Sequence, residues 1–128
     1  MILVSLQLLI GLFFSILFLQ SGLDKVFDFK GNKGYIGSVF ANTFLKPLAP
    51  MLFMVITLLE IAAGFLCAAG CIYYFFNDNE TLLLMGLQLS ALSLLCLFFG
   101  QRIAKDYAGA GGLVAYFLVA AFGIYLFV

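Results

Sequence analysis

The stretch LLEIAAGFLCAAGC, residues Leu58 to Cys71, places one carboxylate inside a long run that is otherwise almost entirely apolar or small. A charge near the middle of a bilayer costs at least ~2.5 kcal/mol on insertion scales, and leucine at the same position would insert more easily. Glu60 therefore either has a polar partner inside the fold or stays protonated.

The whole chain shares this apolar character. Of its 128 residues, 66% are hydrophobic and 9% are charged, which lies far outside the usage of soluble globular proteins. At roughly 20 residues per crossing, the length allows about four transmembrane helices and little besides. The formal net charge is zero, so the basic surface that nucleic-acid binding requires is missing and that class is excluded.

Four apolar segments are separated by more polar connections. The expected transmembrane helices cover about residues 2–23, 50–76, 81–100 and 111–128. The second is expected to open at Pro47 and Pro50, because proline suits the first turn of a helix. The NDNE stretch at 77–80 is expected to be a tight turn whose Asn and Asp side chains cap the following helix. The predicted fold is an all-α membrane protein, a single-domain bundle of four transmembrane helices.

The long connection at 24–49 mixes lysines and acidic residues with aromatic side chains. Tyr35, Ile36, Val39, Phe40 and Phe44 recur at near-helical spacing, which predicts a short amphipathic helix in the membrane interface between the first two spans. The alternative is an irregular loop whose aromatic side chains adhere to apolar surfaces. Tyr35, Phe40 and Phe44 are the expected docking residues for a partner, and a simple anchor on the membrane surface is the other interpretation.

All basic residues fall on connections at one side of the predicted bundle. They are Lys25, Lys30, Lys33, Lys46, Arg102 and Lys105. The positive-inside rule places these connections in the cytoplasm. Both termini and the NDNE turn are then expected to face outward.

Small and polar residues line one face of the second span. Glu60, Gly64, Cys67, Ala68 and Cys71 fall at i, i+4, i+7, i+8 and i+11, so they share a helix face. This pattern directs Glu60 into the bundle. Small residues also let helix backbones approach closely in lipid, so compact packing explains the Gly and Ser positions taken singly.

Glu60 is a candidate ligand or proton site, because an ionisable residue inside a membrane is a functional hypothesis by default. Serines expected at comparable depth, if the helices stand upright, are Ser15, Ser90 and Ser93. These hydroxyls can form hydrogen bonds but cannot neutralise a charge. Lys25 and Arg102 form an expected polar cluster at the helix ends, from which either could reach inward.

Residue types limit the chemistry that this chain can perform. It has no His, and its three cysteines, Cys67, Cys71 and Cys96, form no CxxC pair. Paired imidazole ligation of haem is impossible, and no metal site is expected. The thiols are expected to be buried and nearly inert. Because a His base and any other activated nucleophile are missing, we expect no catalytic residue, no intrinsic cofactor and no self-contained catalyst.

Two motifs and the four-helix layout resemble the DoxX family over essentially the whole chain. The motifs are FLQSGLDKVFDF at the end of the first span and LLEIAAGFLCAAG in the second. DoxX proteins are small bacterial inner-membrane proteins with a Gly and a Lys closing the first helix, here Gly22 and Lys25, and a Glu followed by Gly residues in the second, here Glu60, Gly64 and Gly70. The family is similar to the small subunit of thiosulfate:quinone oxidoreductase and includes members associated with thiol and oxidative-stress partners. The resemblance implies a redox-linked subunit of the bacterial inner membrane.

Three functions are compatible with these features. The first is a non-catalytic accessory subunit of a larger, redox-linked membrane complex, in contact with lipid and with other integral membrane proteins or copies of itself. The second is a quinone- or lipid-binding redox component, with a quinone held where Glu60 meets Phe14, Phe65 and Phe98. The third is a small proton or solute transporter. Transport needs a hydrophilic path, and one carboxylate among serines provides few polar groups for it. The stretch GQRIAKDYAGAG at 100–111 indicates no function.

The predicted orientation can be tested by thiol labelling. A cysteine introduced by Asn79→Cys should react with an impermeant thiol reagent added from outside, because the NDNE turn faces outward. The same reagent should miss Lys33→Cys until the membrane is opened. The reverse pattern would place the aromatic connection on the outer face.

Overall fold

The computed structural model describes residues 2–128 as helices joined by short connections. In chain order these are α1 (Ile2–Phe27), α2 (Phe29–Val39), the short 3-10 helix η1 (Lys46–Leu48), α3 (Ala49–Asn77), α4 (Thr81–Ile103) and α5 (Tyr107–Tyr125). The segments Ile2–Phe27, Lys46–Asn77, Thr81–Ile103 and Tyr107–Tyr125 are long and apolar enough to cross a membrane. The predicted class, an all-α membrane protein with four transmembrane helices, is confirmed.

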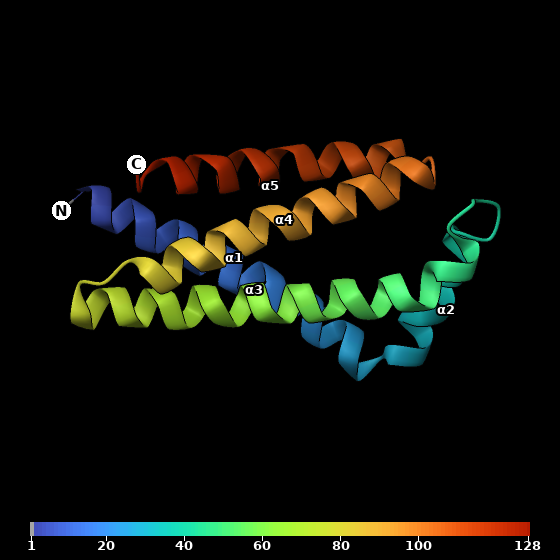
Figure 1. Ribbon diagram of the computed structural model, residues 1–128, viewed down its shortest axis with the longest axis horizontal. Helices are drawn as coiled ribbons and strands as arrows, with labels where there is room; N and C mark the ends of the chain where they lie inside the picture. Colours follow the sequence, from blue (N-terminus) through green and yellow to red (C-terminus); the bar gives the residue numbers. More distant parts are fainter. Residues whose placement is uncertain (1) are drawn as a thin grey trace.

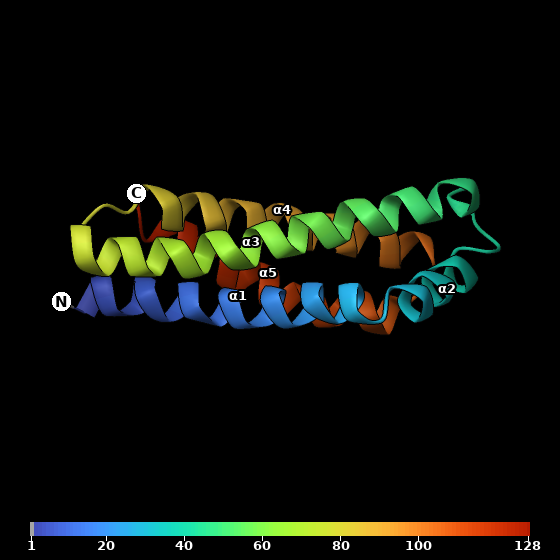
Figure 2. The ribbon, with the colours of Figure 1, turned by 90° about the horizontal axis from the view of Figure 1, so that it is seen from below.

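The four long helices run antiparallel to their neighbours along the chain (Figure 1). α3 and α4 form the central hairpin, α1 packs mainly on α3, and α5 packs mainly on α4. Both termini and the α3–α4 turn lie at one end of the molecule. The other end, which we call the lysine end, holds α2 and the α4–α5 turn. Figure 2 shows that α2 continues beyond the end of α1, where it contacts α3.

The turns explain where the helices begin and end. α5 begins at Tyr107 instead of the expected 111, because the Asp106 side chain accepts a hydrogen bond of 3.0 Å from the Gly109 amide and caps the helix. At the other end, Asn79 Oδ1 accepts a 3.0 Å hydrogen bond from the Thr81 amide at the start of α4, whereas the N-cap residue is Glu80, whose side chain makes no capping bond. Asp78 ends α3 in the left-handed conformation, with φ of 55°.

The helix predicted within the long connection exists, but it is displaced toward the N-terminus. α2 covers Phe29–Val39, so Phe40 and Phe44 lie beyond it. The Thr43 hydroxyl donates to the Phe40 carbonyl at 2.9 Å and accepts from the Leu45 amide at 3.2 Å. These local bonds satisfy the backbone in a turn and compete with continuation of the helix.

The α3–α4 hairpin is held close by glycines in both helices. A Cβ atom on Gly70 would lie 2.5 Å from the Leu83 Cα and amide nitrogen, and one on Gly86 would lie 2.8 Å from the Cys67 amide nitrogen. Small residues of this kind allow close backbone contact between helices in lipid. The predicted seam of α3 is confirmed in its buried members, which are Glu60, Gly64, Cys67 and Cys71, whereas Ala68 is half-buried.

Gly70→Ala should destabilise the bundle, because the new methyl group meets the backbone of α4, which cannot move without separating the helices. We expect a loss of about 1–3 kcal/mol in the free energy of unfolding, as is typical of overpacking. Gly111→Ala is the matched control, since nothing lies within 4 Å of its Cβ position. Thermal unfolding in detergent measures both, and equal melting temperatures would contradict the close-contact interpretation.

Candidate functional site

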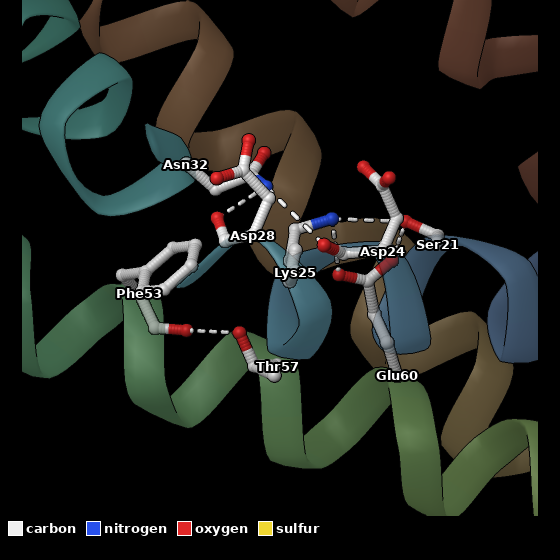
Figure 3. A network of polar contacts seen from close by, with 8 residues as sticks. All are labelled: Ser21, Asp24, Lys25, Asp28, Asn32, Phe53, Thr57 and Glu60. Atoms are coloured by element: carbon white, nitrogen blue, oxygen red, sulfur yellow. Dashed lines mark hydrogen bonds and ion pairs between the residues drawn. The ribbon is translucent and has the colours of Figure 1, made fainter. Parts of the chain in front are cut away.

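Glu60 is buried in the bundle and meets two side chains from the last turns of α1 (Figure 3). Lys25 Nζ lies 2.9 Å from Glu60 Oε1. The Ser21 hydroxyl donates to Glu60 Oε2 at 2.5 Å and accepts from Lys25 Nζ at 2.9 Å. We call Ser21, Lys25 and Glu60 the Glu60 cluster. Each member contacts both of the others, so the carboxylate has the partner that its position in an apolar run requires.

The local sequence of α1 explains how the cluster forms. Ser21 and Lys25 are four residues apart, so they stand one turn apart on the same helix face. Gly22 lies between them against α3, where a Cβ atom would be 2.7 Å from Ile61 Cγ1 and 3.2 Å from the Ile61 amide nitrogen. The missing side chain at Gly22 therefore lets α1 approach α3 closely enough for both polar groups to reach Glu60.

The cluster is asymmetric in its access to the surroundings. The Glu60 side chain is 2% accessible, whereas that of Lys25 is 18% accessible. Lys25 neutralises the carboxylate by charge, but its contact with Oε1 lacks hydrogen-bond geometry, and Oε1 has no hydrogen-bond partner among the described residues. A carboxylate oxygen can accept two hydrogen bonds. Glu60 can therefore accept a further hydrogen bond from a donor group of a small ligand while keeping its bond to Ser21.

The three serines expected near Glu60 form other contacts. Ser90 Oγ donates to the Gly86 carbonyl at 2.8 Å and lies 3.6 Å from Cys67 Sγ, and Ser93 Oγ donates to the Leu89 carbonyl at 2.9 Å. Such bonds within a helix satisfy hydroxyl groups in an apolar environment. Ser15 is buried on α1 without a hydrogen bond to Glu60. The partner on α1 is Ser21 because α3 begins beyond the end of α1, which brings Glu60 level with the last turns of α1.

The two basic residues expected to form a polar cluster at the helix ends, Lys25 and Arg102, have separate contacts. Lys25 turns inward to Glu60. The Arg102 guanidinium carbon lies 4.4 Å from the centroid of the Tyr107 ring, a cation–π contact across the α4–α5 turn.

The three aromatic residues expected to dock a partner have different environments. Tyr35 and Phe44 are 65% and 70% exposed, whereas Phe40 is 8% exposed and packs with Leu45 and Ala49. Only Tyr35 and Phe44 are therefore available on the surface.

The aromatic residues considered for a quinone slot beside Glu60 do not face a common space. Phe14 is fully buried in the core, Phe65 is 57% exposed on the outside of α3, and Phe98 is half-buried on α4. Among residues 2–128, no group of three His, Cys, Asp or Glu side chains is arranged to hold a metal ion.

Sequence reasoning missed Ser21, although its spacing of four from Lys25 was a usable signal. It also missed a polar contact at the end that holds the termini. The Tyr74 hydroxyl donates to Gln7 Oε1 at 2.8 Å, and Gln7 Nε2 donates to the Leu126 carbonyl at 2.9 Å. This chain of bonds joins α1, α3 and the end of α5, so a second buried polar contact ties the bundle together.

α5 is the least buried of the four spanning helices. In its most apolar window 17% of the residues are buried, against 33% in each of the other three. Its exposed residues include a group of small ones that the helix period places on one face: Ala108, Gly111, Gly112 and Ala115. Nothing lies within 4 Å of the Cβ positions of Gly111 and Gly112. We call these four residues the small face of α5.

A double-mutant cycle should detect the coupling between Glu60 and Lys25. Glu60→Gln and Lys25→Gln should each lower the free energy of unfolding in detergent, because each leaves a charge without its counterion. The loss in free energy of unfolding of the double variant should be smaller than the sum of the two single losses by at least about 1 kcal/mol. Glu60→Gln combined with Ser93→Ala is the control and should be additive, since Ser93 bonds to its own helix. Additivity in the Lys25 cycle would contradict the ion pair.

Comparison of the chain with protein-family models, with curated proteins and with solved structures finds no match in any of the three. The resemblance to DoxX proteins therefore stays a prediction from the residues quoted from the sequence.

Proposed function

We propose that this protein is a non-catalytic accessory subunit of a larger membrane complex and that the small face of α5 binds a transmembrane helix of another protein. The observation that carries the proposal is the exposure of this face in a helix that has few buried residues. Leucine-rich surfaces gain nothing by leaving lipid, whereas small residues permit the close backbone contact that drives helix association in membranes. An exposed group of Gly and Ala on a spanning helix therefore favours a helical partner.

The α2 region provides a second contact for the same partner. Tyr35 and Phe44 are exposed aromatic residues, and Lys30, Lys33 and Lys46 are exposed around them in the chain. Aromatic residues are enriched in the buried centres of protein interfaces. In the orientation favoured by the positive-inside rule, this surface lies on the cytoplasmic side and both termini face outward.

The complex is proposed to be redox-linked and to belong to a bacterial inner membrane, as the DoxX resemblance implies. The chain has no His and no CxxC motif, so the partner supplies the redox centre. The Glu60 cluster suits this role, because a buried carboxylate paired with a partly accessible lysine can exchange a proton when a neighbouring subunit changes its charge.

Co-purification in mild detergent tests the proposal. The unmodified chain should retain a stoichiometric membrane protein, and Gly112→Leu should release it, because the larger side chain prevents close helix contact. Val114→Leu is the control, since Val114 is 47% exposed on α5 outside the small face. Tyr35→Ser with Phe44→Ser should weaken retention without affecting insertion.

Purification of the unmodified protein as a lone, active oligomer would contradict the subunit role. Equal partner retention by Gly112→Leu and Val114→Leu would exclude the small face as the contact. Both variants are expected to fold, because the Cβ position of Gly112 meets no atom within 4 Å.

A further inference from the structure

A cavity of about 580 Å³ lies between α2, α3 and α4 at the lysine end, and its lining includes no residue of the Glu60 cluster or of the small face of α5. Its volume falls within the range of roughly 300–1,000 Å³ that is typical of small-molecule sites. On α3 the lining extends from Leu52 to Leu59, which at 1.5 Å per residue corresponds to about 10 Å along the helix. The lining of the cavity therefore extends over about two turns of α3.

The two ends of this cavity differ in polarity. The end toward the middle of the bundle is apolar and is lined by Ile56, Leu59 and Leu95. The end toward the connections includes Tyr35, Gln101 and Asp106. This gradient runs in the same sense as the polarity of a bilayer leaflet, from apolar centre to polar surface. An amphiphile with its chain pointing inward would match the cavity.

The polar end holds one unpaired acceptor. Gln101 Oε1 is buried and has no hydrogen-bond partner among the described residues. Asp106 adds a carboxylate, one oxygen of which already accepts from Gly109. A headgroup that donates hydrogen bonds would satisfy these oxygens, whereas an anionic headgroup would meet the charge of Asp106.

From this arrangement we infer that the cavity is a binding site for an acyl lipid whose headgroup donates hydrogen bonds through a hydroxyl or ammonium group. The chain occupies the apolar end between α3 and α4, and the headgroup lies at Gln101 and Asp106. α2 forms the wall opposite these helices through Tyr35 and Ile36. This site shares no residue with the proposed partner contact on α5, and it shares Tyr35 with the proposed contact on α2.

The absence of Trp from the chain permits a direct test by fluorescence. Phe99→Trp places one indole at the cavity, and Phe65→Trp places one on α3 outside it; the two phenylalanines are 55% and 57% exposed. The detergent-solubilised variants are titrated with a long-chain alcohol brominated in its chain. Quenching should saturate for Phe99→Trp. For Phe65→Trp it should rise without saturating, in proportion to the alcohol that partitions into the micelle. If quenching in both variants rises with the concentration of the alcohol without saturating, the alcohol only contacts the protein from the micelle. That result would overturn the proposal.

Filling the cavity should abolish the saturable phase. Ile56→Phe is introduced beside Phe99→Trp, and Gly100→Leu serves as a second filling variant in case the first does not fold. Leu58→Phe is the matched control, because Leu58 is 66% exposed on α3 and does not line the cavity. Saturable quenching that survives in a folded filling variant would also overturn the proposal.

Headgroup chemistry is tested with the brominated alcohol, amine and carboxylic acid of one chain length. At a pH where the acid is fully ionised and has no donor hydrogen, the alcohol and the amine should reach half-saturation at concentrations about tenfold lower than the acid, since only they satisfy the buried acceptor. Gln101→Leu should remove most of the advantage of the alcohol, and the amine should keep the part due to Asp106. Equal half-saturation for all three compounds in the protein with Gln101 intact would contradict a donor-selective site.

Discussion

The need of one buried carboxylate for a partner constrains the arrangement of the whole bundle. Glu60 lies in an apolar helix and is removed from solvent, and a charge in such a place is costly unless it is paired. Lys25 meets this need only if the last turns of α1 lie against α3 at the level of Glu60. Gly22 makes that approach sterically feasible. The ion pair therefore sets the position of α1 along α3.

This position has consequences at the lysine end. Because α1 ends near the level of Phe53, whose ring lies 5.2 Å from that of Phe29, the first turns of α3 and the last turns of α4 extend beyond it. α2 and the turn around Phe40 cover this part of the hairpin instead. The cover is incomplete and leaves the cavity lined by Tyr35 and Gln101. The ion pair and the cavity are thus linked by the place where α1 stops.

The remaining contacts divide the bundle into a tight and a loose part. α3 and α4 meet through Gly70 and Gly86, at distances that exclude any larger side chain. α5 contacts mainly α4, and its small face stays exposed. Since apolar side chains gain no hydrophobic free energy by moving from lipid to protein, an exposed small face is where further helix association is most favourable. The loosely held helix is accordingly the one to which the proposed partner binds.

The sequence alone determined the four spans, the antiparallel order, the turn at NDNE and the inward face of Glu60, because these follow from local composition and helix period. It did not determine which serine meets Glu60, since Ser15 and Ser21 both lie on the first span and only the relative shift of α1 and α3 separates them. The sequence does not distinguish Phe40 from Phe44. In the structure, the turn at Thr43 leaves Phe40 buried and Phe44 exposed. The relative shift of α1 and α3 and the geometry of the turn at Thr43 were decided by tertiary contacts. Both depend on how the surfaces of two segments fit together, and the sequence of one segment does not encode that fit.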